Sequence, residues 1–361
     1  MKRGLLFGIC LCCWMSWSTL AHAEVVIVDS SAFTDVSGGE TQDTASPQTT
    51  LPPAEVPSGW PRTITITVGG DCTLGCTDAQ AKRSVGFRSV VEKEGYAWPF
   101  SGIVDFLSQD DMTLVNLEGT LTESNQRVEK TFNFKGPAAY GEILTAGSVE
   151  AVNLANNHFI DYGEQGKEDT KAALDAHGVT HAGNGDLGVY EIKGVKIGMT
   201  GYSFPFSKGK KDIRADVEQL REMGCQIVIA SFHWGSEYEP NFSRDQRTIG
   251  RAAIDAGADV VVGHHPHIVQ GIEKYKGRYI LYSLGNLVFG GNTDPDDRDT
   301  YLGRLTFTVD ETASVPPTLE IYPVRLTSLS SGTDYRPVPA EGKAAERIQT
   351  RIRERSSNLD E

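Results

Sequence analysis

Basic residues are scarce in this chain of 361 residues, in which 34 Lys and Arg stand against 48 Asp and Glu and give a formal net charge of −14. Nucleic acids and anionic membrane surfaces are bound by cationic faces, so this balance argues against general affinity for either, although it allows a local basic patch. Cysteine is scarce as well, with six in the chain. None lies in the His-rich segments described below, which argues against a closed structural zinc site built from Cys and His.

Long hydrophobic runs are missing except at the N-terminus. There, Lys2 and Arg3 precede an apolar stretch (4–20) that closes on Ala-His-Ala at 21–23, a pattern typical of a signal peptide. We expect residues 1–23 to be removed and the protein to be exported, extracellular or associated with the cell envelope, with no intrinsic membrane domain after cleavage. An uncleaved signal anchor is the alternative, because the stretch is about as long as the shortest membrane-spanning helices.

The composition also sets the domain boundaries. Residues 24–61 contain no Lys or Arg, six acidic residues and many Ser, Thr, Pro and Gly. Such a segment cannot bury enough apolar surface to fold, so we expect a disordered acidic linker. The folded domain is expected over 62–336. In the last segment, 337–361, three apolar residues recur at helical spacing, which predicts a C-terminal surface helix and a tail.

Strand-like and helix-like segments alternate between those boundaries. The expected strands are 63–68, 112–117, 148–155, 226–232, 258–263 and 278–284. The expected helices are 78–93, 100–108, 166–177, 213–223 and 244–256. Strands that alternate with helices indicate an α/β domain whose sheet is covered by helices on both faces.

Polar side chains follow five of these strands. In chain order they are Asp71, then Asn116 and Glu118, then Asn156, Asn157 and His158, then His233, and finally His264, His265 and His267. Ligands bind at the carboxyl ends of strands in open α/β sheets, so these groups can converge on one site. Carboxylate, amide and imidazole ligands together suit Mn²⁺, Fe or Zn²⁺. Such ions generate hydroxide and stabilise charge at a phosphoryl or acyl centre, so the pattern predicts a hydrolytic metal site.

Six motifs in this order resemble one known family. They are "GDCTLG", "VNLEGTLT", "NLANNHFIDYG", "FHWGSEY", "GHHPHIVQGIE" and "ILYSLGNLVFG". Over roughly 63–330 the chain resembles the CapA-type capsule (poly-γ-glutamate) biosynthesis proteins, a branch of the calcineurin-like metallophosphoesterase superfamily. The resemblance implies a four-layered β-sandwich flanked by helices, and a role in making, exporting or anchoring an anionic polymer of the cell envelope.

The resemblance also implies a role for particular side chains. Six of them resemble metal ligands: Asp71, Glu118, Asn157, His233, His265 and His267. His158 resembles the histidine that acts as general acid on the leaving group. Thr73 stands where the family at large has the histidine of Asp-x-His, and Glu118 stands in place of the bridging Asp. These departures affect one of two metal positions, so one or two divalent ions are expected.

Other polar side chains have two interpretations each. Lys135, Asn116 and Asn286 are assigned to substrate binding, although Lys135 could equally be a solvated lysine. Asn286 could orient a site water or a histidine ligand, or form a turn. His264 is expected to be structural, and Asn156 could serve as ligand or as turn residue.

The two cysteines of the first motif also leave alternatives open. Cys72 and Cys76 are spaced so that a disulfide could stiffen their loop in an oxidising compartment, and we expect one. Two free thiols are equally compatible with the spacing.

The function expected from the sequence is that of an exported, metal-dependent, phosphoesterase-like protein. One alternative is a non-catalytic metal-binding component of a polymer synthase or export complex. Another is a hydrolase or transferase acting on γ-glutamyl amides with the same groups. Expected partners are an anionic polymer or phosphoester substrate and, as an open alternative, membrane-bound polymer synthase subunits; no nucleic acid is expected.

Overall fold

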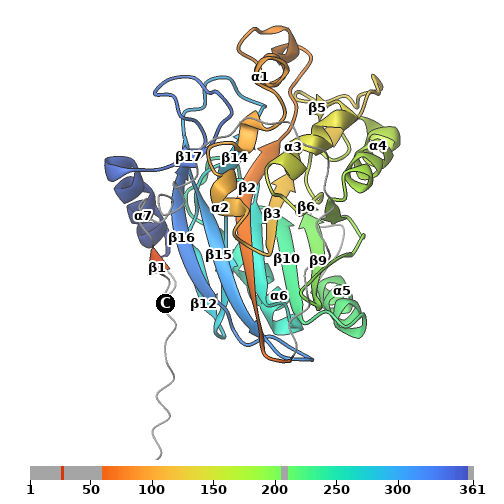
Figure 1. Cartoon of the computed structure of the whole chain (residues 1–361), viewed down its shortest axis with the longest axis vertical. Coiled ribbons are helices and arrows are strands. Elements are labelled where there is room, and N and C mark those ends of the chain that lie inside the picture. The colour runs from red at the N-terminus through yellow and green to blue at the C-terminus, as the bar shows by residue number, and fades with distance from the viewer. Residues whose placement is uncertain (1–25, 28–58, 205–209, 357–361) are drawn as a thin grey trace, which may run out of the picture.

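The computed structural model describes residues 26–27, 59–204 and 210–356. The predicted signal peptide, most of the predicted linker and the final tail lie outside them. The described residues form an α/β fold in which two β-sheets pack face to face and helices cover both outer faces (Figure 1). The α/β class and the four-layered sandwich expected above are therefore confirmed.

The larger sheet contains nine strands within the described residues, in the order β1-β16-β15-β2-β3-β6-β7, with β14 beside β2 and β17 beside β16. Their bounds are β1 (Val26–Ile27), β2 (Arg62–Thr73), β3 (Met112–Leu117), β6 (Ala151–Asn153), β7 (Thr180–Ala182), β14 (Asn286–Phe289), β15 (Asp299–Val309), β16 (Thr318–Arg325) and β17 (Val338–Pro339). Strand β1 falls within the predicted linker and pairs in parallel with β16, so at least these two residues depart from the expected disorder.

The smaller sheet has the order β12-β13-β11-β10-β9-β8. Its strands are β8 (Gly188–Ile192), β9 (Val195–Ser203), β10 (Ile227–His233), β11 (Val260–His264), β12 (Ile272–Tyr275) and β13 (Arg278–Leu281). A two-stranded ribbon, β4 (Thr120–Leu121) with β5 (Lys135–Gly136), lies apart from both sheets. Strands β2, β3 and β6 run parallel in one sheet and β9, β10 and β11 in the other, so each sheet gathers several carboxyl ends at one edge.

The main core lies between the two sheets. The alternating sequence of β2 directs Ile64, Ile66 and Val68 into this space, where all three are fully buried. They belong to one apolar cluster with Ile229 of β10 and Val262 of β11. Each Å² of apolar surface that is buried stabilises the fold by about 25 cal/mol, and this burial holds the two sheets together.

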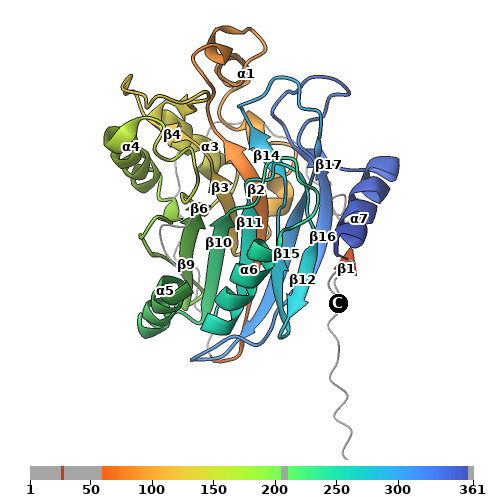
Figure 2. The same ribbon diagram turned by 180° about the vertical axis from the view of Figure 1, so that it is seen from behind.

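Helices cover the outer faces and one edge of the sandwich (Figure 2). The larger sheet is covered by α1 (Phe87–Glu94), α2 (Val104–Leu107), α3 (Gly141–Ala146) and α4 (Gly163–Ala176), and the smaller by α5 (Lys210–Glu222) and α6 (Arg244–Ala256). Short 3₁₀ turns are η2 (Gln80–Lys82), η3 (Trp98–Phe100) and η4 (Ala138–Tyr140). The predicted C-terminal helix is α7 (Gly342–Ser356), whose Ala345, Ile348 and Ile352 join the core between the sheets. Among the described helices, none has the length and hydropathy needed to cross a membrane.

The expected disulfide is wrong, because Cys72 and Cys76 are both free and buried. Cys72 lies within β2 and packs in the apolar cluster beneath α1 to α4, where burial raises the pKa of its thiol above the usual range. Cys76 instead lies beside Lys135, to which its backbone pairs in an isolated bridge. Because β2 continues to Thr73, the chain is extended where the disulfide would have required a tight loop.

Candidate metal centre

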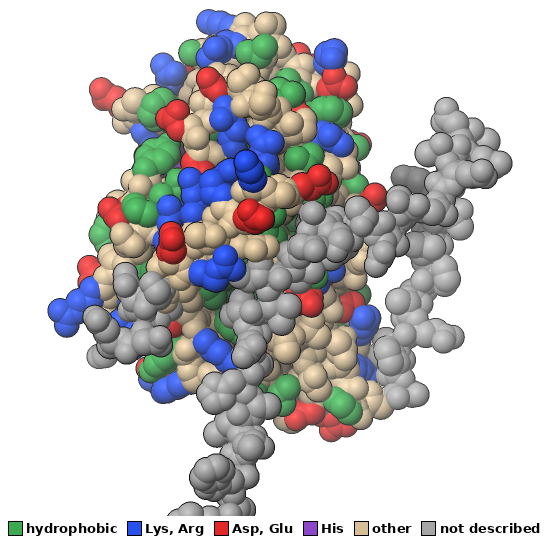
Figure 3. All heavy atoms as spheres, turned by 90° about the vertical axis from the view of Figure 1, so that its left-hand side faces the viewer, with side chains coloured by type: hydrophobic (Ala, Val, Ile, Leu, Met, Phe, Trp, Pro, Cys, Tyr) green, Lys and Arg blue, Asp and Glu red, His purple; other side chains and the backbone are tan. Residues whose placement is uncertain are grey.

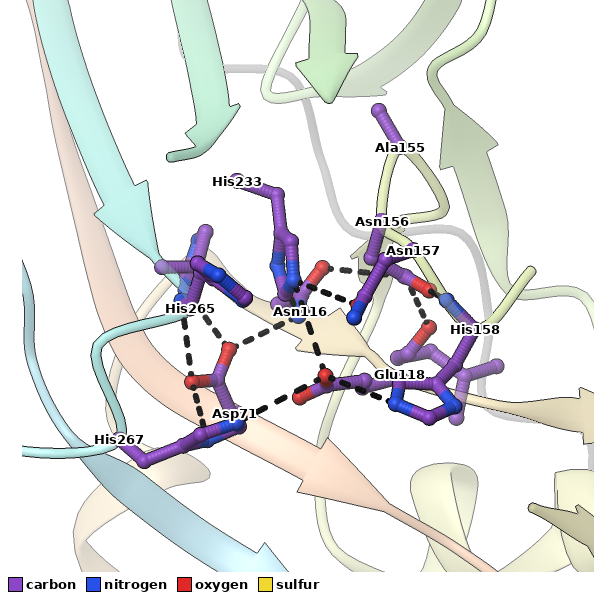
Figure 4. A network of polar contacts seen from close by, with 12 residues as sticks. Asp71, Asn116, Glu118, Ala155, Asn156, Asn157, His158, His233, His265 and His267 are labelled. Carbon is purple, nitrogen blue, oxygen red and sulfur yellow. Dashed lines mark hydrogen bonds and ion pairs between the residues drawn. The ribbon is translucent and has the colours of Figure 1, made fainter. Parts of the chain in front are cut away.

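The polar residues predicted from the sequence meet where the carboxyl ends of the two sheets come together (Figure 4). Strand register builds the first part of this site. Asp71 of β2 lies opposite Asn116 of β3, which in turn lies opposite Asn153 of β6. Asn116 Nδ2 donates a hydrogen bond of 2.8 Å to Asp71 Oδ1, and Asn153 Nδ2 donates one of 2.8 Å to Asn116 Oδ1. This amide chain fixes the orientation of the Asp71 carboxylate.

Glu118, directly after β3, lies at the centre of the cluster. It is fully buried, and neither of its carboxylate oxygens has a hydrogen-bond partner among the described residues. Three imidazoles face its Oε1 atom: His233 Nε2 at 3.6 Å, His158 Nε2 at 3.9 Å and His267 Nε2 at 3.9 Å. Burial raises the pKa of Glu118 to about 8, and the negative charge of Asp71 adds to this. A buried carboxylate without partners is costly, so the arrangement calls for a cation at this position.

Two overlapping ligand groups surround Glu118. One consists of Asp71, Glu118 and His233 and the other of Glu118, His265 and His267, and within each group the ligand atoms lie within 4.8 Å of one another. Asn157 Oδ1 is 2.9 Å from His233 Nε2, so the amide also points into the cluster. The six predicted ligands are thus brought together, and their carboxylate, amide and imidazole atoms fit a divalent ion.

His267 connects the two groups through Asp71. Its Nδ1 is 3.3 Å from Asp71 Oδ2 and 2.9 Å from Asn286 Oδ1, which leaves Nε2 to face Glu118. Burial alone would lower the pKa of His267, but the carboxylates of Glu118 and Asp71 raise it to about 10. Burial would likewise raise the pKa of Asp71, yet His267 holds it below its usual range. Both pKa shifts have the same cause: positive charge is favourable between the carboxylates of Asp71 and Glu118.

The loop after β11 has an unusual backbone. His265 has φ 95° and His267 has φ 58°, in the left-handed region that non-glycine residues rarely occupy. The backbone N–H of His265 donates to Asp71 Oδ2 at 3.3 Å, and its ring lies 4.6 Å from that of His233, centroid to centroid. Strained conformations of this kind persist where the surroundings fix them, which is common at functional sites.

His158 is held by two residues that the sequence analysis did not assign. Its Nδ1 lies 2.7 Å from Asp161 Oδ2, and Lys130 Nζ donates to Asp161 Oδ1 at 2.8 Å. Lys130 Nζ also lies 3.1 Å from His158 Nδ1 and donates to the carbonyl of Asn157 at 2.7 Å. Asp161 stands in the same motif, three residues after His158, so its spacing could have suggested the pair. Lys130 lies in a separate loop and no sequence pattern pointed to it.

Three other residues singled out in the sequence are not among the six proposed ligands: Lys135, Asn156 and His264. Lys135 lies outside the cluster, where its Nζ donates to Ser124 O at 2.7 Å and Asn125 Oδ1 at 2.9 Å beside a cavity of about 290 Å³. Asn156 Nδ2 donates to the carbonyl of Leu117 at 2.7 Å and so links the loop after β6 to the end of β3. His264 is buried, with Nδ1 3.6 Å from Asp71 Oδ1.

The fold and this cluster define an α/β protein with a candidate metal centre shared by two sheets. Residues 65–291 match the family described as bacterial capsule synthesis protein PGA_cap, and the chain belongs to that family.

Similar proteins carry names that agree with this family. The chain is 27% identical over 254 residues to the capsule biosynthesis protein CapA of Bacillus anthracis, which covers 63% of this chain and 60% of that protein. It is 32% identical over 223 residues to the PGA biosynthesis protein CapA of Bacillus subtilis strain 168, covering 55% and 59%. A probable polyglutamine synthesis accessory protein of Mycobacterium tuberculosis is 26% identical over 336 residues, covering 75% and 87%. The chain thus spans about three fifths of the length of the first two relatives.

Among solved structures, a hypothetical protein from Thermus thermophilus aligns with a TM-score of 0.43 at 12% identity, over 72% of this chain and 99% of that chain.

Proposed function

We propose that this protein is a metal-dependent hydrolase of the phosphoesterase type that acts in the synthesis, export or anchoring of an anionic polymer of the cell envelope. The observation that carries the proposal is the Glu118 carboxylate, which is buried, lacks hydrogen-bond partners among the described residues and is faced by three imidazoles. Membership of the capsule synthesis family supports the polymer as the biological context. The names of two relatives, one a PGA biosynthesis protein and the other a probable polyglutamine synthesis accessory protein, support a polymer of glutamate or glutamine units.

The ligand set supports one or two divalent ions. Those that would hold the metal are Asp71, Glu118, Asn157, His233, His265 and His267. When bound, the metal would supply a Lewis acid for the reacting centre and make water nucleophilic at neutral pH. Asn116 and Asn286 contribute by orientation, since each fixes the side chain of a ligand.

His158 is suited to the proton transfer. Because Asp161 binds Nδ1 at 2.7 Å, the ring is oriented with Nε2 toward Glu118. The pKa of His158 is lowered overall, because burial outweighs the opposing hydrogen bond and charge of Asp161. In its protonated form the ring, with Nδ1 held by Asp161, can give its Nε2 proton to a leaving group at the proposed metal centre.

Export belongs to the same proposal. Secretion with removal of residues 1–23 would place the protein in the envelope, where membrane-bound synthase subunits are the proposed partners. Mass spectrometry of the N-terminus of protein recovered from the producing cell tests this cleavage. A chain that retains its first 23 residues would contradict it.

Metal analysis combined with two assays tests the activity. Purified protein loaded with Mn²⁺, Zn²⁺ or Fe²⁺ is expected to bind at least one ion and to hydrolyse a generic phosphodiester. Glu118→Gln is the matched variant, because it keeps the side-chain shape and removes the charge. Hydrolysis of a γ-glutamyl polymer without phosphodiester cleavage would replace the proposal by an amide hydrolase. Metal binding without turnover of either substrate would replace it by a non-catalytic component.

A further inference from the structure

Exposed hydrophobic side chains gather on the loops at the candidate metal centre. Eight large hydrophobic side chains are exposed among the described residues, and four of them belong to these loops: Phe132, Ile160, Phe204 and Tyr238. Ile160 lies two residues after His158, and Phe204 donates its N–H to the carbonyl of His233 at 2.9 Å. On the face that carries α7, by contrast, hydrophobic side chains are dispersed among charged ones (Figure 3). Apolar surface concentrated beside a candidate site indicates a binding function.

Two of these side chains, Phe132 and Tyr238, form the ends of a row of rings. Phe132 stacks on Phe134 with ring centroids 6.3 Å apart, and Phe134 lies 6.1 Å from Phe289. The ring of Phe289 is 5.1 Å from that of His267, which in turn is 6.2 Å from that of Tyr238. These five side chains are called the aromatic row. The ends of the row are exposed, and its middle is buried or half-buried.

The aromatic row passes both the proposed proton donor and a proposed metal ligand. The ring of Phe134 lies 4.4 Å from that of His158, centroid to centroid. Its backbone N–H donates at 2.7 Å to Asp161 Oδ2, the oxygen that also holds His158. Farther along the row, His267 directs Nε2 toward Glu118. A group held against the row is therefore close to the atoms assigned to the reaction.

The backbone of Tyr238 is an independent sign of function. Its φ of 60° lies in the left-handed region, which bulky residues rarely adopt. Its N–H donates to the carbonyl of Pro266 at 2.8 Å, which fixes the chain beside His267. The side chain is nevertheless 63% exposed, so its own burial does little to offset the strain. Strain of this kind is common at positions that serve binding or catalysis.

The charges around Tyr238 favour an uncharged group over a further carboxylate. Partial burial, together with the carboxylates of Glu237, Asp296 and Glu118, raises the pKa of Tyr238. The tyrosine hydroxyl therefore stays protonated at neutral pH and has negative charge near it. The positive charge of His267 is already shared by the carboxylates that face it. An apolar group placed here would be removed from water without meeting repulsion.

We propose that the aromatic row binds an apolar ester group of the substrate, so that the protein acts on phosphoesters of apolar alcohols. Phe132 and Tyr238 are then specificity-determining residues for the reaction at the metal centre. Aromatic rings remove apolar groups from water and attract other rings in addition. The inference rests on the proposed function for the reacting phosphoester. A lipid chain and an aryl group share the required chemistry, and the experiment separates them.

Binding of three phosphonates to the full chain loaded with Mn²⁺ tests the aromatic row. Methylphosphonate, phenylphosphonate and octylphosphonate have the same anionic head group and differ in the apolar part. Calorimetric titration should show that wild type binds the phenyl or octyl compound about tenfold more tightly than the methyl compound, because the larger groups bury more apolar surface. In Phe132→Ala/Tyr238→Gly this preference should fall to about twofold or less, since both exposed rings are gone. Tighter binding of octylphosphonate than of phenylphosphonate would identify a lipid chain, and the reverse order an aryl group.

Single variants separate the loss of a ring from damage to the fold. Tyr238→Gly removes the ring and adopts the left-handed backbone without strain, so it should unfold at about the wild-type temperature while the preference falls about threefold. Tyr238→Phe keeps the ring and should keep the preference. Met223→Ala is the matched control, because Met223 is another exposed hydrophobic side chain and lies after α5, at the opposite end of β10 from His233. It should bind all three phosphonates as wild type does. If the double variant unfolds, Tyr238→Gly decides the comparison.

Two results would overturn the inference: a wild type that binds the three phosphonates equally or not at all, and a preference that survives in the double variant. Equal losses in the double variant and Met223→Ala would reduce the preference to unspecific contact, which also rejects it.

The aromatic row and the proposed hydrolase can fail separately. Preference that depends on Phe132 and Tyr238 in a protein without phosphoester turnover would reject the hydrolase alone. If the protein takes up no ion, the same titrations with a chelator present decide the preference. Turnover of phosphoesters by a protein whose double variant keeps the wild-type preference would reject the aromatic row alone.

Discussion

At the scale of single residues, Glu118 and His158 face the same centre but have different surroundings. Glu118 has no hydrogen-bond partner among the described residues, whereas His158 is held by Asp161 and lies beside Lys130. A residue without protein partners is suited to hold an ion, and a residue with an oriented ring is suited to move a proton. Substitutions at the two positions should therefore have different effects.

Glu118→Gln should abolish stabilisation by metal. A ligand that binds only the folded state at 100 times its dissociation constant stabilises it by about 2.7 kcal/mol. Wild type should therefore unfold at a higher temperature with Mn²⁺ or Zn²⁺ than with a chelator, and Glu118→Gln should show little such difference. Scanning calorimetry with and without metal measures both. An equal shift in the two proteins would mean that the ion binds elsewhere.

His158→Ala should separate metal content from turnover. If the ring protonates a leaving group, its loss should lower turnover by roughly 10²–10⁴-fold while bound metal stays nearly constant. His265→Ala is the comparison, since removal of a ligand should lower metal content and turnover together. Elemental analysis beside the phosphodiester assay measures both quantities. Loss of metal in His158→Ala to the same extent as in His265→Ala would make His158 a ligand.

At the scale of elements, α7 is attached to the sandwich by both polar and apolar contacts. Its ion pairs reach Asp297 and Asp299, and its apolar side enters the core between the sheets. Ile348 is fully buried there. Arg347 and Arg351 are partly exposed but Asp299 is buried, so the ion pairs and the apolar contacts both anchor this helix.

Ile348→Ala should destabilise the protein by about 2–5 kcal/mol, through lost apolar burial and the cavity left behind. Glu346→Ala is the control on the same helix, since Glu346 is exposed, and it should change stability by less than about 0.5 kcal/mol. Urea unfolding followed by circular dichroism compares the two. Similar small effects would show that α7 does not share the main core.

Elements with clear patterns were predictable, and those with mixed patterns were not. The alternation in β2 and the apolar runs of β3, β10 and β11 placed the metal ligands at strand ends. Strand β15 was missed because Arg304 interrupts its pattern, although its guanidinium packs 3.6 Å from the ring centroid of Phe106. The helix expected over 78–93 begins only at Phe87, after the turn η2. The left-handed backbone of the His265 loop and the contact of Lys130 depend on tertiary packing, which local sequence does not encode.

At the scale of the whole molecule, carboxyl groups with a raised pKa lie toward both ends of the sandwich. The candidate metal centre occupies the end where parallel strands finish, and Asp110 lies just before β3, toward the other end. Burial, with the charge of Glu150, raises the pKa of Asp110 to about 7. Thr113 Oγ1 donates to Asp110 Oδ2 at 2.9 Å. This carboxyl group makes stability depend on pH independently of the metal.

Asp110→Asn should remove that dependence. The folded-state pKa of about 7 lies above the value of 3.8 for an unperturbed Asp, so the folded state binds more protons between these values and loses stability as pH rises through them. The variant should gain about 1–2 kcal/mol over wild type between pH 4 and pH 8, after allowance for partial exposure. Urea unfolding at both pH values measures the difference. Asp105→Asn, at an exposed position of α2, is the control, and a gain that does not change with pH would contradict the assignment.

The proposed metal ligands are spread over roughly 200 residues of sequence, from Asp71 in β2 to His267 after β11, and they belong to two different sheets. Contacts of such large sequence separation form late, because the chain entropy of closing long loops opposes them. A nascent chain therefore cannot assemble the full ligand set until His267 has left the ribosome and both sheets have docked. Ion uptake would then mark the completion of folding, and an exported chain would acquire its metal in the compartment where it folds.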